Sequence, residues 1–394
     1  MIRRELQLID SNSLFIFGPR GVGKTTYLKN SIFFPQAIYI NLLKASEENK
    51  FSRNPDELAT IVQGLDLAAG NIRYVIIDEV QKLPKLLDVV HDLIETTSIK
   101  FILTGSSARK LKQDGANLLA GRAFVYSLFP FCITEIENQV ESEFSLNNAL
   151  RWGMLPKIFE CETDLSKLKF LEAYTNTYLK EEIWLEQVVR DLAPFQYFLQ
   201  VAAQSNGKLV NFSKMAQDVG TSDMSVKKYY GILEDTLLGF FLQPFQHSFR
   251  KRLGKIPKFY FFDPGVVRSL AGRVSVPLEP STMAYGDAFE HFIILQCKQL
   301  ATYHRHEYRF SFIKTKEDAE IDLVVERPGQ KLLLIEIKST DQIKDEHLKT
   351  LNQIHSELEN SEAVCFSQDP YPKKIGEVLV LPWLEGVKKY FGAL

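Results

Sequence analysis

The sequence lacks the features of membrane proteins and of disulfide-stabilised proteins. Its 394 residues contain no apolar run near the roughly 18 residues that a membrane-spanning helix needs. The first residues, M-I-R-R-E, include no apolar stretch of the kind found in a signal peptide. The four cysteines are scattered without a C-x-x-C pair, so they predict neither a zinc site nor a disulfide framework. We therefore expect a cytoplasmic protein with no membrane partner.

The sequence also lacks a large excess of positively or negatively charged residues. Lys and Arg number 47 and Asp and Glu number 49, which gives a formal net charge of −2 and no overall attraction to nucleic acid. A local exception is residues 249–258, F-R-K-R-L-G-K-I-P-K, with five cations and no acid. This basic segment predicts contact with DNA; the alternative is a solvated loop packed on acidic neighbours. The chain length favours two or three domains.

The most specific motif present is a phosphate-binding loop. Residues 18–25 read G-P-R-G-V-G-K-T, after an apolar run and before a stretch without helix breakers. This context predicts binding of a nucleoside triphosphate, because glycines and a helix start let backbone N–H groups surround phosphates. Lys24 would reach the β and γ phosphates, and the Thr25 hydroxyl would bind Mg²⁺. The predicted ATP-binding residues are Gly18, Pro19, Arg20, Gly21, Val22, Gly23, Lys24, Thr25 and Thr26.

Two further apolar runs predict the rest of an ATPase site. Residues 73–79, R-Y-V-I-I-D-E, read as a strand buried in a parallel sheet and ending in two carboxylates. Asp78 would hold Mg²⁺ through water, and Glu79 would polarise the attacking water, which makes hydrolysis the expected reaction. Residues 100–107 predict a strand between the other two. Thr104 on it would sense the γ-phosphate, unless it only marks the end of an ordinary strand.

These motifs, with L-A-G-R-A at 119–123 and L-F-P-F at 128–131, resemble the AAA-type bacterial and archaeal P-loop ATPase family. The resemblance implies an α/β protein with an ATPase core, a helical region with a winged helix, and a C-terminal nuclease-like domain of uncharacterised function. It also makes Arg109 and Arg122 candidates for sensing the γ-phosphate, or for a finger donated to a neighbouring subunit of a homo-oligomer. A surface salt bridge is the alternative for either arginine.

Taken with this resemblance, the pattern along the chain predicts four segments. Residues 212–216 and 222–234 read as two short helices around a turn, with Asn211 as a cap, which is the helix-turn-helix pattern. Residues 259–265, F-Y-F-F-D-P-G, predict a strand that runs into a tight turn. The predicted segments are a P-loop AAA-type ATPase domain (1–140), a helical lid or linker (141–193), a winged-helix region (194–248) and a restriction-endonuclease-like α/β domain (249–394).

The last segment contains a spaced group of charged residues. Asp322 lies in the alternating run 320–325, and Glu336 and Lys338 lie in L-L-L-I-E-I-K-S at 332–339. Because strand side chains alternate, Glu336 and Lys338 share a face, and a hairpin partner would place Asp322 beside them. The group resembles the D…E-x-K motif of the PD-(D/E)XK nuclease superfamily. The resemblance implies Mg²⁺ or Mn²⁺ bound by Glu290, Asp322 and Glu336, with Glu336 and Lys338 in catalysis. A polar, solvated strand edge is the alternative.

Together these observations favour an ATP-hydrolysing protein that binds duplex or branched DNA and remodels, translocates along or processes it. Nuclease activity is left open, because nuclease folds also serve as binding platforms. The alternative is a slow nucleotide switch that controls partner binding and has a non-catalytic C-terminal domain.

Overall fold

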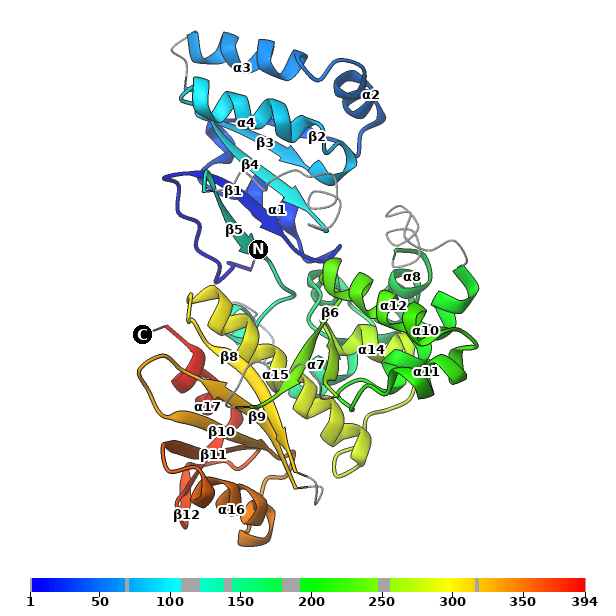
Figure 1. Cartoon of the computed structure of the whole chain (residues 1–394), viewed down its shortest axis with the longest axis vertical. Coiled ribbons are helices and arrows are strands. Elements are labelled where there is room, and N and C mark those ends of the chain that lie inside the picture. Colours follow the sequence, from blue (N-terminus) through cyan, green and yellow to red (C-terminus); the bar gives the residue numbers. More distant parts are fainter. Residues whose placement is uncertain are drawn as a thin grey trace. The chain divides into compact units, whose positions relative to one another are not determined.

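A computed structural model describes residues 2–67, 71–107, 121–137, 144–178, 192–246, 256–315 and 319–393. Its contacts divide the chain into two compact units. The first unit consists of Leu6–Pro130 and Ile232–Leu238, and the second of Met1–Glu5, Phe131–Gly231 and Gly239–Leu394 (Figure 1). In the described part of the chain, no helix is long and apolar enough to cross a membrane.

The first unit is built on a parallel sheet with the strand order β2-β3-β4-β1-β5. All four neighbouring pairs run parallel, and β4 lies between β1 and β3, which confirms the predicted strand position. β1 and β3 are buried along their whole length, as continuous apolar runs predict. The strands are β1 (Ser13–Phe17), β2 (Ala37–Asn41), β3 (Tyr74–Asp78), β4 (Lys100–Gly105) and β5 (Ala123–Ser127).

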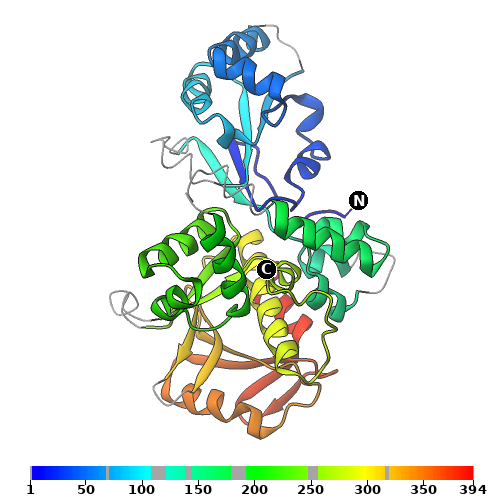
Figure 2. The same cartoon turned by 90° about the vertical axis from the view of Figure 1, so that its right-hand side faces the viewer.

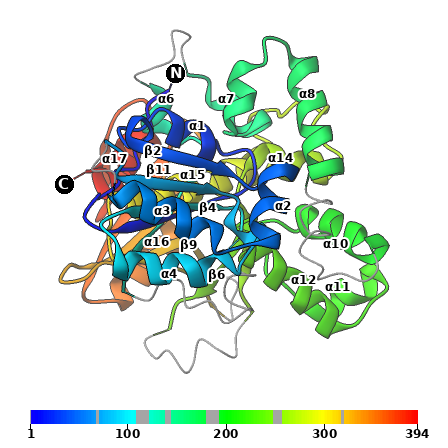
Figure 3. The ribbon, with the colours of Figure 1, turned by 90° about the horizontal axis from the view of Figure 1, so that it is seen from above.

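Helices of the first unit pack on this sheet through one apolar core. Leu58 and Val62 of α3 and Val90 and Leu93 of α4 join buried strand residues such as Val75 in that core. Figures 1 and 3 both show α3 beside α4. The helical segments are α1 (Lys24–Lys29), η1 (Phe34–Gln36), α2 (Ala45–Arg53), α3 (Glu57–Leu67), η2 (Val80–Lys82) and α4 (Leu86–Thr96).

The second unit contains a mixed sheet with the order β12-β13-β11-β10-β9-β8-β6-β7. β8, β9 and β10 pair antiparallel, whereas β10, β11 and β13 pair parallel. The strands are β6 (Gly239–Pro244), β7 (Lys258–Phe261), β8 (Arg309–Lys314), β9 (Glu320–Glu326), β10 (Leu332–Ile337), β11 (Ser361–Ser367), β12 (Lys373–Ile375) and β13 (Val378–Pro382).

Helices cover this sheet and form a helical region beside it. Leu351 and Ile354 of α16 pack on Val324 and Leu334 of the strands, and Figure 2 shows α16, in orange, along them. The helical segments are α6 (Ile133–Glu137), α7 (Leu146–Trp152), η3 (Pro156–Glu160), α8 (Asp164–Ala173), a π-helical turn (Tyr174–Tyr178), α10 (Leu192–Gln204), α11 (Phe212–Val219), α12 (Asp223–Asp235), α14 (Pro264–Leu270), α15 (Met283–Tyr303), η5 (Asp345–Leu348), α16 (Lys349–Glu357) and α17 (Trp383–Phe391).

The helix-turn-helix pattern corresponds to α11 and α12. The predicted cap is confirmed, because the Asn211 side chain accepts a hydrogen bond from the Lys214 N–H at 3.0 Å. Gly220 ends α11 with a φ of 73°, a left-handed conformation that favours glycine. β6 and β7, which lie before and after the expected domain boundary at residue 248, pair antiparallel with Phe241 opposite Phe259. The sheet of the second unit thus includes strands on both sides of that expected boundary, and the four domain limits stay a prediction.

The expected tight turn at residues 263–265 is instead the start of α14. The Asp263 carboxylate accepts a hydrogen bond from the Val266 N–H at 3.0 Å, and Pro264 occupies the first helical position. Aspartate at a helix cap followed by proline is a helix-start signal, which the prediction overlooked. Asp263 also accepts a hydrogen bond from the Met154 N–H at 2.7 Å, so it joins α14 to the chain after α7.

We predict that Asp263→Ala lowers the free energy of unfolding of the second unit by about 2–4 kcal/mol. The change removes a helix cap and leaves the buried Met154 N–H without its partner. The loss should appear as a lower transition temperature in scanning calorimetry, and an unchanged transition would contradict the assignment.

Asp263→Asn supplies a pH test of the same carboxyl. Burial raises the pKa of Asp263 to about 6, against the lowering effect of its backbone hydrogen bonds. A native pKa above the unfolded value means that this carboxyl stabilises the fold most below about pH 4 and progressively less as the pH rises through 6. The stability of the Asn variant should therefore approach that of the wild type as the pH is raised from 4 to 7.

Candidate ATPase site and acidic site

The phosphate-binding loop follows β1 in the first unit. The Gly18 N–H donates to the Gly105 carbonyl at 3.2 Å, which joins the loop to the end of β4. A Cβ atom at Gly18 would lie 2.2 Å from the Leu128 carbonyl oxygen, so only glycine fits there. Gly21 and Gly23 have φ values of 82° and 90°, the left-handed region that glycine tolerates. The glycine pattern thus follows from the backbone path of the loop.

Lys24 is 5% exposed and is held over this loop. Its Nζ atom donates to the Gly18 carbonyl at 2.7 Å and to the Pro19 carbonyl at 3.3 Å. The other expected ATP-binding side chains differ in exposure: Val22 is buried, Arg20 is half-buried and Thr26 is exposed. Their contacts with a nucleotide stay a prediction.

The Asp78 carboxylate lies at the end of β3 and accepts hydrogen bonds from three hydroxyl groups. The Thr25 hydroxyl donates to Oδ2 at 2.7 Å, the Tyr39 hydroxyl donates to the same oxygen at 2.6 Å, and the Thr104 hydroxyl donates to Oδ1. The Thr25 hydroxyl and the Asp78 carboxylate therefore lie side by side. Mg²⁺ prefers oxygen ligands of this kind, so the residues present fit the expected ion.

Glu79 follows directly in a strained backbone conformation. Its φ is 60°, which is unusual for a residue other than glycine. Its N–H donates to the Thr104 hydroxyl oxygen at 3.2 Å. Thr104 is fully buried, and its hydroxyl holds Asp78 and Glu79 together. The role of Thr104 as a γ-phosphate sensor stays a prediction.

Three residues of this site were not predicted from the sequence: Tyr39, Gln81 and Ser106. The Gln81 Nε2 atom donates to Oε2 of Glu79 and, at 2.9 Å, to the Ser106 hydroxyl. Gln81 is 7% exposed, and a Cβ atom at Gly105 would lie 2.7 Å from its Oε1 atom. The position of Gln81, two residues after the acidic pair, is the one signal that the sequence offered for it.

We predict that Gln81→Leu lowers kcat for ATP hydrolysis by at least about tenfold and leaves ATP binding nearly unchanged. The reason is that the amide orients the Glu79 carboxylate without touching the loop that holds the phosphates. Steady-state kinetics and ATP titration would separate the two effects. A matched control is Gln63→Leu in α3, which should change neither, and a loss of affinity equal to the loss of kcat would contradict the positioning role.

Arg122 lies away from the phosphate-binding loop. β5 pairs with β1 from Ala123 opposite Ser13, which places Arg122 at the edge where the strands begin, whereas the loop follows the strand ends. Its guanidinium pairs with the Glu95 carboxylate. Within one chain this geometry does not support sensing of the γ-phosphate, and a finger role toward a neighbouring subunit stays a prediction. Arg109 lies outside the described residues.

In the second unit the structure brings Asp322, Glu336 and Lys338 together, as predicted. β9 and β10 pair antiparallel with Leu323 opposite Ile335, a register that puts Asp322 opposite Glu336. The Lys338 ammonium lies 2.5 Å from Oε1 of Glu336. The Ile337 N–H donates to Oδ2 of Asp322 at 2.7 Å. Adjacent strands therefore present two carboxylates and a lysine at one place.

Burial governs the electrostatics of these carboxylates. Asp322 and Glu336 are 8% and 5% exposed. Burial, followed by the nearby Glu336 charge, raises the pKa of Asp322 well above its usual range. Burial also raises the pKa of Glu336, against the lowering effect of Lys338. Oε2 of Glu336 is buried and has no hydrogen-bond partner within the described part of the chain. Two raised carboxyl pKa values and an unpaired oxygen are features of functional sites.

At Lys258 the structure contradicts the expected contact of the basic segment with DNA. It was counted with the basic segment 249–258, but it is 3% exposed and faces acidic side chains. Its ammonium lies 3.2 Å from Oε1 of Glu290 and 2.5 Å from Oε1 of Glu320. Burial lowers its pKa, but these two carboxylates raise it more, so the group stays charged. A buried cation needs such partners, which is why Lys258 is no DNA contact. Residues 249–255 lie outside the described residues.

The same contacts occupy Glu290, the predicted helix ligand of a metal. Its Oε1 atom accepts hydrogen bonds from Lys258 and, at 2.6 Å, from the Tyr260 hydroxyl. Over the ranges that the structure describes, no three His, Cys, Asp or Glu side chains are arranged to hold a metal ion together. Metal binding by Glu290, Asp322 and Glu336 therefore stays a prediction.

Comparison with known proteins finds a family match for the sequence of the first unit. Residues 10–137 match a family described as an AAA domain, and residues 143–276 and 285–384 match two domains of unknown function, DUF8612 and DUF4143. With the parallel sheet and the loop, the first match gives this unit a P-loop ATPase fold. The C-terminal part is a further α/β domain.

The chain is also similar to uncharacterised proteins. It is 24% identical to the uncharacterized protein Rv2008c of Mycobacterium tuberculosis over 80% of this chain and 68% of the relative. It is 23% identical to the uncharacterized protein MJ1637 of Methanocaldococcus jannaschii over 94% of this chain and 83% of the relative. Among solved structures, the Aeropyrum pernix ORC1 protein in complex with DNA is 12% identical, with a TM-score of 0.25, over 67% of this chain and 87% of its own. A TM-score this low carries no argument.

Proposed function

We propose that this chain hydrolyses ATP in its first unit and couples turnover to work on DNA. The ATPase half of the proposal rests on one observation. Lys24, Thr25, Asp78 and Glu79 lie together at the carboxyl edge of one parallel sheet. A buried cation, a hydroxyl–carboxylate pair and a second carboxylate are the groups that phosphoryl transfer to water requires.

Each side chain has a distinct part in this proposal. Lys24 binds and orients the β and γ phosphates through its positive charge. Thr25 and Asp78 would hold Mg²⁺, which neutralises phosphate charge when bound. Glu79 accepts a proton from the attacking water as a general base, and Gln81 holds the Glu79 carboxylate in place through Nε2.

The DNA half of the proposal is supported by the helix-turn-helix-like pair α11 and α12. α12 exposes Met224, Lys227 and Lys228, the kind of surface that enters a groove and contacts phosphates. Ser225 of the same helix is half-buried, and its N–H donates to the Ser222 hydroxyl at 3.1 Å in the helix cap. The β6–β7 hairpin would be the wing.

A physical connection favours coupling over two independent activities. The last turn of α12 and the residues after it, Ile232–Leu238, belong to the first unit. The Ser107 hydroxyl, just after β4, donates to the Asp235 carbonyl at 3.2 Å, and Leu237 packs against the core of that unit. β4 also carries Thr104, which binds Asp78 and Glu79. A change at the ATP site would thus reach the helix that we assign to DNA.

We predict that one form of DNA raises the ATPase rate of the purified protein. The rate should be measured without nucleic acid and with single-stranded, duplex and branched DNA, with Lys24→Ala as the blank. Lys227→Ala with Lys228→Ala should remove the stimulation and keep the basal rate, because neither residue lies at the ATP site. A slow rate that no form of DNA changes would favour the alternative, a nucleotide switch that controls partner binding.

A second candidate activity is metal-dependent cleavage of DNA in the second unit. The observation that favours it is the buried Oε2 atom of Glu336, which none of the described residues hydrogen-bonds, opposite Asp322 and with Lys338 beside them. These oxygens fit a hard divalent cation, which lowers the pKa of a bound water when present. Lys338 would orient or stabilise the nucleophile.

We predict that Mn²⁺ or Mg²⁺ raises the transition temperature of the second unit, because the cation compensates two buried carboxylates. Asp322→Asn should abolish that shift and any divalent-dependent cleavage of plasmid DNA, and it should spare the ATPase rate. A shift or a cleavage rate that survives in the Asn variant would contradict this site.

A further inference from the structure

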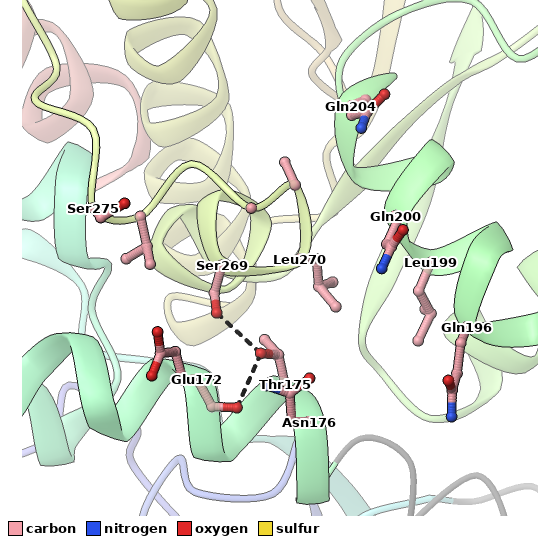
Figure 4. A pocket seen from close by; sticks show the side chains of 13 residues that line it. Glu172, Thr175, Asn176, Gln196, Leu199, Gln200, Gln204, Ser269, Leu270 and Ser275 are labelled. Carbon is pink, nitrogen blue, oxygen red and sulfur yellow. Dashed lines mark hydrogen bonds between the residues drawn. The ribbon is translucent and has the colours of Figure 1, made fainter.

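A cavity of about 400 Å³ lies in the helical region of the second unit, and its described lining shares no residue with either site above. Its walls are the π-helical turn Tyr174–Tyr178, α10 and the end of α14 with the loop after it (Figure 4). Its volume is within the range of ligand sites, and π-helical turns frequently occur at functional positions.

Three carboxamides form a row along one wall of this cavity. Gln196, Gln200 and Gln204 follow one another on α10 with a spacing of four residues, and Figure 4 shows them across from Thr175 and Ser269. A spacing of four keeps them within an arc of about 80° on one helix face. None of the three side chains has a hydrogen-bond partner among the described residues. Each therefore offers one donor group and one acceptor.

The spacing of this row matches that of an extended polypeptide. Four residues of α-helix advance about 6 Å, and two residues of extended chain advance about 6.6 Å. Successive carboxamides would therefore meet every second backbone amide group of a strand-like segment. The three glutamines span about 12 Å, which is about four residues of such a segment.

The rest of the lining favours a peptide over a nucleic acid. No Lys, Arg or His is present among the described lining residues, so a phosphate backbone would find no cation there. Among the described lining residues the ionisable side chain is Glu172, which Lys169 contacts at 2.8 Å. Leu199, Leu270 and Val274 are the apolar part of the lining on which alternate side chains of the segment would pack.

We propose that this cavity binds an extended segment of a partner polypeptide through its backbone. The carboxamide row supplies backbone hydrogen bonds, the apolar side chains receive every second residue, and Glu172 disfavours acidic residues. This inference is independent of ATP hydrolysis and DNA binding, because none of its residues belongs to either proposed site.

The test uses the full chain and fluorescence anisotropy. The probe is a capped, fluorescein-labelled hexapeptide of alternating valine and lysine, and three comparison ligands accompany it. The first is the same peptide N-methylated at alternate residues, which keeps the side chains and removes backbone donors. The second replaces lysine by glutamate. The third is an oligothymidylate of about eight nucleotides, the length that a single-strand-binding fold accommodates.

We expect saturable binding of the valine–lysine peptide, and a loss of at least about tenfold in affinity on N-methylation or in the triple variant Gln196→Leu, Gln200→Leu and Gln204→Leu. Gln217→Leu, an exposed glutamine on α11 outside the cavity, should leave the affinity unchanged. The ATPase rate and the transition temperature should match the wild type in both variants, which separates binding from folding.

Three results would overturn the proposal. One is the absence of saturable peptide binding up to about 1 mM, the weak limit of specific affinity. Another is peptide affinity that the triple substitution does not change. The third is oligothymidylate binding that the triple substitution removes while peptide binding stays absent, which would assign the cavity to single-stranded nucleic acid.

Discussion

The hydrogen bonding of the Asp78 carboxylate is the interaction on which the candidate ATPase site depends. A carboxylate buried at a strand end is costly unless it is hydrogen-bonded. Three hydroxyls meet this need, and they come from the first turn of α1, from β2 and from β4. The same bonds therefore join the end of β3 to both neighbouring strands and to the helix that follows the phosphate-binding loop. They fix where the phosphate-binding loop lies, and they place Glu79, with its left-handed backbone, next to Gln81.

The second unit balances buried charge in another way. Lys258 and Lys338 are placed against acidic side chains, and both stay charged because the carboxylates raise their pKa more than burial lowers it. The balance is incomplete at Glu336, whose Oε2 atom has no hydrogen-bond partner among the residues that the structure describes. Breaking up such a group is destabilising, but retaining it brings little stability, which favours a functional reason for it. A divalent cation bound there would complete the balance of charge.

The sequence predicts best those features that depend on residues close together along the chain. The phosphate-binding loop and the position of β4 followed from local patterns, and alternation along two strands was enough to bring Asp322 to Glu336. The contacts of Tyr39 with Asp78 and of Lys258 with Glu290 and Glu320 join segments far apart in the chain, and only the folded structure reveals them. Lys258 was misjudged for this reason: within its own segment it is one of several cations, whereas in the fold it is buried among carboxylates.

The most direct test of the central claim, ATP hydrolysis by Glu79 at this site, is single-turnover hydrolysis by Glu79→Gln. The variant and the wild type would be mixed with a substoichiometric amount of Mg²⁺-ATP, and bound ATP and ADP would be followed over time. The account predicts that the variant binds ATP as tightly as the wild type and hydrolyses it at least about a hundredfold more slowly. Hydrolysis by the variant at the wild-type rate would contradict it.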